Sequence, residues 1–204
     1  MGSADIIERT VAALEAGEIV VLPTDTVYGL AAAAFGAEPA RRLYRLKGRD
    51  EIQPTALMAS SVDVLLEWIP ELSGQPAAIV WALLPGPFTL IVPNPARRYC
   101  WLSGIRPETI GVRVPVLSGA VAEVVDRLGA IVATSANLPG GPDPRRLDEV
   151  PAAIRAGVVA ALDGGELPGT PSTVIDLTGR KAVILRAGAG DPEEALARCA
   201  AAHT

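Results

Sequence analysis

Two short polar stretches of the chain together hold the residue types that bind phosphate groups. Lys47 and Arg49 flank Gly48 at the end of an arginine-rich segment, and Ser135 and Asn137 follow an apolar run much later in the sequence. Two cations, a hydroxyl and an amide supply the charge and the donors that phosphate oxygens require. Either stretch alone could instead be a solvated helix end or an ordinary turn, so the surrounding elements decide whether the four side chains can meet.

The charge balance indicates that any anion is bound locally. The chain carries 18 lysines and arginines against 23 aspartates and glutamates, a formal net charge of -5, so its overall field repels nucleic acid. Five cations nevertheless fall within nine residues, namely Arg41, Arg42, Arg45, Lys47 and Arg49. We expect Arg41 and Arg42 to be solvated, and Lys47 and Arg49 to be the functional pair.

Length and composition predict one domain over residues 1–204. Half of the 204 residues are apolar, which is enough for one substantial core. Cys100 and Cys199 are far apart with no CxxC motif, so neither a zinc site nor a disulfide framework is expected, and a cytoplasmic location fits. No apolar run approaches the roughly 20 residues that span a bilayer. The only histidine, His203, is next to last, and we expect a frayed terminal residue without a catalytic role.

The hydrophobic pattern predicts alternating helices and strands. Apolar residues at helical spacing predict helices over 6–14, 39–46, 62–69, 75–84, 118–128, near 147–154 and from 192 onward. Short apolar runs predict strands over 19–22, 55–59, 88–92, 110–114, 130–133, 158–163, 173–177 and 182–185. The segment 93–107 has no clear period and is expected to be a surface loop. Because the closing strands lack helices between them, a mixed α/β sheet is favoured over a purely parallel one.

Polar side chains gather near the ends of the predicted strands. Thr24, Asp25 and Thr26 follow the first strand, and open α/β sheets bind their ligands at the carboxyl ends of strands. Arg113 lies inside a predicted strand that Thr109 precedes, and a charged residue in such a run is unusual unless it is paired. Two alternatives stay open for Arg113, an edge strand with its side chain in water or a contact to a ligand.

The sequence lacks the common nucleotide-binding and hydrolase motifs. It contains no GxGxxG, no GxxxxGKS/T and no GxSxG, and without a usable histidine a Ser-His-Asp hydrolase is not expected. The Thr, Ser, Asn, Lys and Arg residues at strand ends suit a polyanion together with a small zwitterion. Phosphoryl and nucleotidyl transfers are catalysed mainly by positioning and charge neutralisation, because their transition state spreads negative charge over oxygen atoms.

Seven motifs, taken in order, resemble those of one enzyme family. They are Pro23-Thr24-Asp25-Thr26-Val27-Tyr28-Gly29-Leu30, Lys47-Gly48-Arg49, Pro85-Gly86-Pro87-Phe88-Thr89-Leu90, Val112-Arg113-Val114-Pro115, Ser135-Ala136-Asn137, Ser172-Thr173-Val174-Ile175-Asp176-Leu177 and Leu185-Arg186-Ala187-Gly188. The resemblance is to the YrdC family of threonylcarbamoyl-AMP synthases, and it covers residues from about 10 to 190. Any one motif is a weak signal, whereas seven in the same order are specific.

The resemblance implies a fold and a reaction. The implied fold is a twisted mixed α/β sheet flanked by helices, YrdC/RibB-like, with a concave, positively lined cavity. The implied enzyme is a nucleotidyltransferase that joins L-threonine, bicarbonate and ATP into threonylcarbamoyl-AMP and releases pyrophosphate, the first step of threonylcarbamoyladenosine modification of tRNA. A separate tRNA threonylcarbamoyl transferase is expected downstream. Longer relatives carry an additional C-terminal domain, so the chain is similar to the single-domain form.

The resemblance implies which residues of this chain bind the substrates, position by position. Those that fall where the family holds threonine are Thr26, Arg113, Ser135 and Ser172, with Arg113 expected to pair with the carboxylate. Those that fall where it meets ATP are Lys47, Arg49, Gln53, Thr109, Asn137, Arg145 and Arg186, of which Lys47 and Arg49 are the expected catalytic pair. Mg²⁺ is expected to arrive with ATP, held by phosphate and water, because the sequence shows no carboxylate cluster that would form a dedicated protein site.

Three positions depart from the family pattern. Gln53 stands where relatives often have Asn or Lys, which keeps a hydrogen-bonding side chain but no charge. Met58 stands where some relatives have a histidine near the threonine, and Arg145 stands where a small hydroxyl residue is common. Each departure changes a local contact and leaves the overall resemblance intact.

Two other functions fit the implied fold. A concave basic surface would also suit double-stranded RNA, so the alternative is a double-stranded RNA-binding or ribosome-maturation module. The net charge of -5 and the lack of interleaved aromatic residues argue against high RNA affinity, although weak RNA binding stays possible. The related modules of hydrogenase-maturation carbamoyltransferases usually belong to much longer chains with zinc-finger and acylphosphatase-like parts, none of which is present here.

Overall fold

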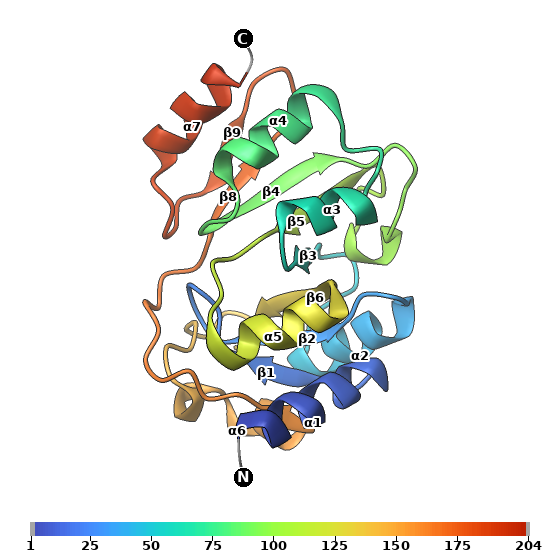
Figure 1. The fold of residues 1–204 in the computed structure, drawn as a ribbon, viewed down its shortest axis with the longest axis vertical. Helices are drawn as coiled ribbons and strands as arrows, with labels where there is room; N and C mark the ends of the chain where they lie inside the picture. The colour runs from blue at the N-terminus through green and yellow to red at the C-terminus, as the bar shows by residue number, and fades with distance from the viewer. Residues whose placement is uncertain (1–2, 203–204) are drawn as a thin grey trace.

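Nine strands within residues 3–202, the part of the chain that the computed structural model describes, form one sheet (Figure 1). The strand order is β7-β1-β2-β6-β3-β5-β4-β8-β9. The strands are β1 (Val20–Leu22), β2 (Gly29–Ala33), β3 (Ala56–Ala59), β4 (Phe88–Pro93), β5 (Thr109–Arg113), β6 (Ala130–Ser135), β7 (Ala160–Ala161), β8 (Thr173–Asp176) and β9 (Val183–Arg186). The pairs β1–β7, β3–β5 and β4–β8 are parallel and the other neighbours are antiparallel, which confirms the predicted mixed sheet.

Seven α-helices and two short 3₁₀ helices accompany the sheet in this range. The α-helices are α1 (Ser3–Glu15), α2 (Ala37–Lys47), α3 (Val62–Trp68), α4 (Gly74–Leu83), α5 (Gly119–Leu128), α6 (Ala152–Ala156) and α7 (Pro192–Ala201). The 3₁₀ helices are η1 (Cys100–Leu102) and η2 (Leu147–Glu149). None of the described helices is long and apolar enough to cross a membrane.

The two faces of the sheet bury different helices, because successive side chains of a strand point to opposite faces. One face packs Ala31, Met58 and Ile131 against α1 and α5. The neighbours of these residues, such as Leu57 and Val132, point to the other face and join the larger core with α2, α3, α4 and α7. In Figure 1, α1 and α5 lie side by side at one end of the molecule, and α4 and α7 lie together at the other.

The end of α2 sets the path of the following arginine. Gly48 has φ +67°, a left-handed conformation that favours glycine, and its N–H donates to carbonyl groups of the last helical turn. The backbone N–H of Arg49 donates to the carbonyl of Tyr44 at 2.9 Å. The chain therefore leaves the helix at the glycine, close to the predicted end at residue 46, and the side chain of Arg49 reaches Thr134 on β6.

The buried Asn94 orders the loop over 93–107, which was predicted to lie on the surface without regular structure. The side-chain amide of Asn94 donates to the carbonyl groups of Arg98 at 2.7 Å and Pro107 at 3.2 Å, and its oxygen accepts from the N–H of Arg98 at 3.0 Å. These bonds join the two ends of the loop. The loop contains η1 and carries Ser103 and Arg106 to the cavity described below.

Three elements differ from the sequence prediction. The small-residue run after Tyr28 forms the interior strand β2, which was not predicted, and its alanines are buried in the protein core. The helix predicted over 147–154 is divided into η2 and α6, because Pro151 has no N–H with which to continue a helix. The strand predicted over 158–163 is reduced to β7 at the edge of the sheet. His203 lies outside the described residues.

Candidate active site

A cavity of about 510 Å³ lies on the sheet face that also packs α1 and α5. Alternate strand residues line it: Ala56 and Met58 of β3, Thr89 and Ile91 of β4, Gly111 and Arg113 of β5, Ala133 and Ser135 of β6, and Val174 of β8. The strands also contribute Gly29 of β2, Thr109 of β5, and Leu185 and Arg186 of β9, and the neighbouring segments add Thr24, Val27, Arg49, Pro54, Thr55, Ser103, Ile105, Arg106, Pro171 and Ser172. Leu57, Leu90 and Val112, which lie between these positions on β3, β4 and β5, belong to the larger core, so the same alternation builds both the core and the cavity there. Thr134 of β6 is an exception, because it lines the cavity between Ala133 and Ser135.

The lining of the cavity holds four arginines and, among the residues that the structure describes, no carboxylate. The arginines are Arg49, Arg106, Arg113 and Arg186. Acids from outside the lining compensate two of them, since Asp25 pairs with Arg113, and Asp176 and Glu108 pair with Arg106. The other two donate to hydroxyl and carbonyl oxygens. The cavity is therefore locally cationic in a protein whose formal net charge is -5.

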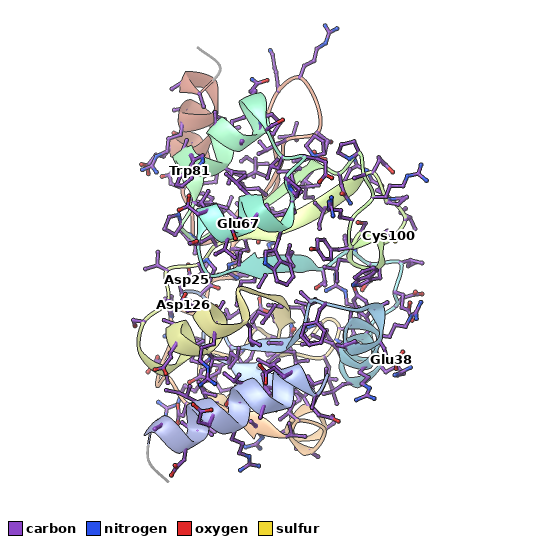
Figure 2. All side chains as sticks on the ribbon, turned by 45° about the vertical axis from the view of Figure 1, so that its right-hand side comes forward. Asp25, Glu38, Glu67, Trp81, Cys100 and Asp126 are labelled. Carbon is purple, nitrogen blue, oxygen red and sulfur yellow. The ribbon has the colours of Figure 1, made fainter. Side chains whose placement is uncertain are left out.

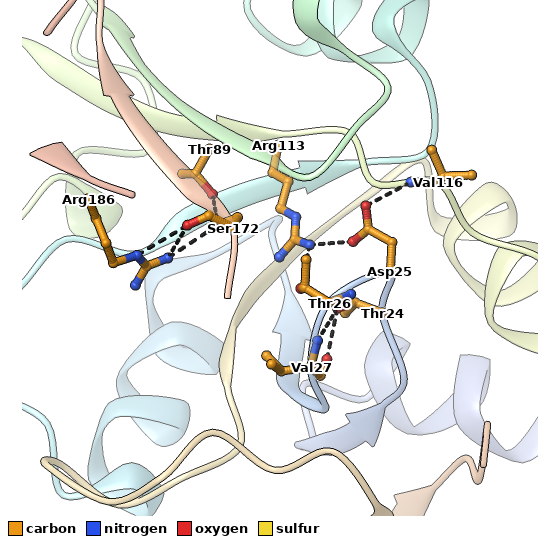
Figure 3. Close-up of polar contacts among 9 residues, drawn as sticks. All are labelled: Thr24, Asp25, Thr26, Val27, Thr89, Arg113, Val116, Ser172 and Arg186. Carbon is orange, nitrogen blue, oxygen red and sulfur yellow. Dashed lines mark hydrogen bonds and ion pairs between the residues drawn. The ribbon is translucent and has the colours of Figure 1, made fainter. Parts of the chain in front are cut away.

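Arg113 lies on β5, in the interior of the sheet between β3 and β4, and its side chain is 12% exposed. Its Nη2 atom pairs with Oδ1 of Asp25 and donates to Oγ1 of Thr26 at 2.7 Å (Figure 3). Burial lowers the pKa of Arg113, and the Asp25 carboxylate opposes that shift by favouring the charged form. The edge-strand alternative is therefore wrong, and the buried charge is tolerated because it is paired.

Arg49 is bound by two neutral groups. Its Nη1 donates to Oγ1 of Thr134 at 3.0 Å, and its Nη2 donates to the carbonyl of Pro54 at 2.5 Å. Its Nε is buried and has no hydrogen-bond partner within residues 3–202, and burial lowers the pKa of the guanidinium. A positive charge without a carboxylate at the wall of a cavity is suited to an anionic ligand.

Arg186 and Ser172 form one unit on the opposite side of the cavity from the β1–β2 loop (Figure 3). Nε and Nη2 of Arg186 donate to the carbonyl of Ser172 at 3.1 and 2.8 Å, and the hydroxyl of Ser172 lies 2.7 Å from that of Thr89. The hydroxyl of Thr173 accepts from the N–H of Gly188 at 2.9 Å, which holds the start of β8 against the chain that follows β9. This network therefore holds the hydroxyl of Ser172 and the guanidinium of Arg186 next to each other in the cavity wall.

Lys47 joins the two polar stretches of the sequence. Its side chain is nearly fully buried, and its Nζ donates to the carbonyl of Ser135 at 2.5 Å, the carbonyl of Asn137 at 2.9 Å and Oδ1 of Asn137 at 2.6 Å. An ammonium has three donors, and these contacts use all of them. Lys47 is not among the residues that line the cavity. The two stretches therefore do meet, with the lysine behind the cavity wall holding the 135–137 segment.

The titration of Lys47 gives a testable stability prediction. Burial, and then repulsion from Arg49, lowers the pKa of Lys47 from 10.5 to about 8. Between these values the unfolded chain binds more protons at this site than the folded protein, so the contribution of Lys47 to the free energy of unfolding rises with pH there and is flat below about pH 8. Urea unfolding of the wild type and of Lys47→Met should show the wild type gaining stability relative to the variant across this window. A difference that stays constant or falls would contradict the prediction.

The predicted binding residues divide into two groups. Those that line the cavity are Arg49, Thr109, Arg113, Ser135, Ser172 and Arg186. Thr26 is fully buried behind Arg113, and Asn137 is bound to Lys47 and to the carbonyl of Gly141. Gln53 is exposed outside the lining, and Arg145 is exposed and paired with Glu166 at 2.6 Å. The positions of Gln53 and Arg145 therefore give no support to their expected contact with ATP.

The remaining arginines of α2 lie on its outer surface, as expected. Arg41 pairs with Glu51 at 3.3 Å, Arg42 with Glu18 at 3.3 Å and Arg45 with Glu38 at 2.6 Å, all between exposed side chains. Figure 2 shows Glu38, a residue of α2, at the periphery of the molecule. These cations are solvated, and only Lys47 and Arg49 of the basic segment turn inward.

Thr24, which the sequence placed at a ligand-binding strand end, lines the cavity, but sequence reasoning missed other residues of the wall, among them Thr55, Thr89, Ser103 and Arg106. Thr89 carried a usable signal, because it occupies a polar alternate position in a predicted strand. Ser103 and Arg106 carried none, since they belong to a loop without periodicity. Met58, which departs from the family pattern, lines the cavity and also packs into the core beneath α1 and α5.

Comparison with known proteins identifies the class that this fold and cavity define. A family model with the description Sua5_yciO_yrdC, telomere recombination, matches residues 12–188. The chain therefore belongs to the Sua5, YciO and YrdC family. Threonylcarbamoyl-AMP synthase of Pyrococcus abyssi is 35% identical over 182 residues, which cover 87% of this chain and 52% of that protein. A putative threonylcarbamoyl-AMP synthase of Mycobacterium tuberculosis H37Rv is 31% identical over 183 residues, which cover 89% of this chain and 83% of that protein.

Solved structures agree with this assignment. The crystal structure of Pyrococcus abyssi Sua5 complexed with L-threonine has a TM-score of 0.83 at 30% identity, covering 95% of this chain and 57% of that one. Escherichia coli YciO has a TM-score of 0.79 at 25% identity, covering 93% of this chain and 92% of that one. The chain thus spans about half the length of the Pyrococcus protein and most of the length of the others.

Proposed function

We propose that the chain is an L-threonylcarbamoyladenylate synthase, a nucleotidyltransferase that converts L-threonine, bicarbonate and ATP to threonylcarbamoyl-AMP and pyrophosphate. The observation that carries the proposal is the division of charge in the cavity. Arg113 is balanced by Asp25, whereas Arg49 and Arg186 bond to neutral oxygens. Such a cavity fits a ligand with one carboxylate and several phosphate groups. The names of the curated relatives and the threonine complex of Pyrococcus Sua5 support the same function.

The length of β5 matches an elongated ligand. Thr109 and Arg113 lie at its two ends and both line the cavity, and the rise of a strand puts them roughly 13 Å apart. The lining between them is formed by the small residues Gly111 and Ala56, which leave space above the strand. We place the amino acid at the Arg113 end and the nucleoside at the Thr109 end, with the phosphates between them.

The chemistry divides into two steps. The amine of threonine takes up bicarbonate with loss of water, which forms a carbamate. An oxygen of the carbamate then attacks the α-phosphorus of ATP, and the bond from that phosphorus to the bridging oxygen of the β-phosphate breaks. Pyrophosphate leaves with the electron pair of that bond, so negative charge grows on the departing oxygens.

The side chains take distinct roles in this scheme. Arg113 binds the carboxylate of threonine, with the hydroxyl groups of Ser135 and Ser172 nearby as donors or acceptors. Arg49 and Arg186 offset the charge on the phosphates as pyrophosphate departs, because preorganised cations stabilise charge that develops in the transition state. Lys47 acts behind the wall by holding the segment that bears Ser135.

Mg²⁺ would enter with ATP. Within residues 3–202 no three His, Cys, Asp or Glu side chains gather as metal ligands, and the cavity lining supplies hydroxyl groups and arginines. This donor set does not fit a cation held by the protein, so its ligands would be phosphate and water oxygens.

The product is a mixed anhydride between a carbamate and AMP. We propose that a separate tRNA threonylcarbamoyl transferase consumes it, and that the chain works in the cytoplasm, where tRNA is modified. The structure does not support the RNA-binding alternative. The exposed arginines of α2 are paired with glutamates, so they do not form an uncompensated basic surface for the RNA backbone.

Pyrophosphate release tests the proposed function. The purified protein should release pyrophosphate and form a nucleotide that contains both AMP and threonine only when L-threonine, bicarbonate and ATP are all supplied. Omission of each substrate in turn is the control, with the product followed by chromatography and mass. Release that is unchanged without threonine would overturn the proposal.

A further inference from the structure

We infer that Asp25 is a positioning residue for the amino-acid end of the cavity, and that it orients the guanidinium of Arg113 toward the carboxylate of the substrate. The inference rests on the proposed function, because it assigns Arg113 to an α-amino acid. Asp25 is 11% exposed and is not among the residues that line the cavity. It therefore acts through Arg113 and not by touching the substrate.

The carboxylate of Asp25 is fixed from two sides. Its Oδ1 accepts from Nη2 of Arg113, and its Oδ2 accepts from the backbone N–H of Val116 at 3.2 Å (Figure 3). Asp25 belongs to the β1–β2 loop and Val116 to the segment after β5, so one side chain connects two parts of the chain. An acid that is itself held in place can hold its partner in one orientation.

The remaining donors of Arg113 are left for a ligand. Nη2 is shared between Asp25 and Thr26, whereas Nε is buried and has no hydrogen-bond partner in the described part of the chain. A guanidinium is planar, so fixing one of its nitrogens to a carboxylate fixes the directions of the other donors. A second carboxylate, that of the substrate, can then be bound on the cavity side.

Two other roles for Asp25 predict different results. If Asp25 only compensated a buried charge, its loss would lower stability without a selective effect on the amino acid. If it bound the substrate directly, its loss would weaken binding even in a protein without Arg113. A double-mutant cycle over Asp25 and Arg113 separates these roles from positioning.

The experiment measures L-threonine binding by calorimetry, together with the KM values for threonine and ATP. The proteins are the wild type, Asp25→Ala, Arg113→Ala, the double variant, and Asp126→Ala as a control at an exposed aspartate of α5. We expect Asp25→Ala to weaken threonine binding and raise its KM roughly tenfold or more, with the KM for ATP little changed. The double variant should bind threonine no more weakly than Arg113→Ala, and Asp126→Ala should match the wild type.

Several outcomes would overturn the inference. Normal threonine binding by Asp25→Ala would do so, as would losses that add in the double variant or a KM for ATP that rises in parallel. If Asp25→Ala does not fold, Asp25→Asn, which keeps the size and one acceptor, decides by the same criteria. A wild type that binds no threonine would overturn the proposed function as well, whereas a wild type that binds it and an indifferent Asp25 would overturn the inference alone.

Discussion

Arg113→Ala should lose most of its affinity for L-threonine while its KM for ATP changes little. Arg113 is buried on an interior strand, and we assign it to the only carboxylate of the amino acid. Truncating one partner of a buried, hydrogen-bonded charge pair costs about 2–5 kcal/mol. That corresponds to a rise in the KM for threonine of roughly 30-fold to several thousand-fold. Steady-state pyrophosphate release over a range of threonine concentrations measures it.

Two control variants sharpen this result. Arg113→Lys keeps the charge but loses the planar fork, so it should recover only part of the threonine affinity. Arg127→Ala removes an exposed arginine that pairs with Glu8 on the surface, and it should behave as the wild type. Because Arg113→Ala also leaves Asp25 buried without its cation, thermal unfolding should accompany the kinetics. A folded Arg113→Ala protein with normal threonine affinity would disprove the assignment.

The second large effect is expected at Arg49. Removing its guanidinium takes away a preorganised positive charge from the region assigned to the phosphates, which costs about 2 kcal/mol or more of transition-state stabilisation. We therefore expect Arg49→Ala to lower kcat/KM for ATP by roughly 30-fold or more. Part of the loss should appear in kcat, since the charge develops as pyrophosphate leaves.

Arg41→Ala is the matched control, because Arg41 lies in the same basic segment but pairs with Glu51 in solvent. A surface change of this kind costs within about 0.5 kcal/mol, so turnover should be close to that of the wild type. An RNA-binding module would instead lose RNA affinity equally in both variants, with a steep dependence on salt. Equal RNA losses with intact ATP turnover would refute the role proposed for Arg49.

Local features of the sequence determined much of the fold. The apolar periods predicted α2, α3, α4 and α5 and most strands within a few residues of their observed bounds. Gly48 ends α2 two residues beyond the helix predicted over 39–46. Asp191, directly before the helix predicted from residue 192, caps α7 by accepting from the N–H groups of Glu193 and Glu194. These features are readable because a helix period, a cap or a glycine turn depends only on neighbours a few residues away.

The tertiary structure decided elements whose local signal is weak. The alanine run of β2 has little strand propensity, yet it forms an interior strand between β1 and β6, where its small side chains are buried on both faces of the sheet. Burial between two layers, which no local pattern contains, overrides propensity there. The length of the edge strand β7 was likewise decided by pairing, because only Ala160 and Ala161 of the predicted strand pair with β1.

For the site, the sequence determined which residue types are available, and the fold decided what each one does. The motifs identified Lys47, Arg49, Arg113 and Ser172 as candidate binding residues, and all four lie at or directly behind one cavity. Only the structure showed that the donors of Lys47 are fully used by backbone and amide oxygens, and that Arg113 is held by Asp25, 88 residues away in the chain. The reason is that burial and pairing of charge depend on which strands lie next to one another across the sheet, and that arrangement follows from the packing of the whole chain and not from the spacing within any motif.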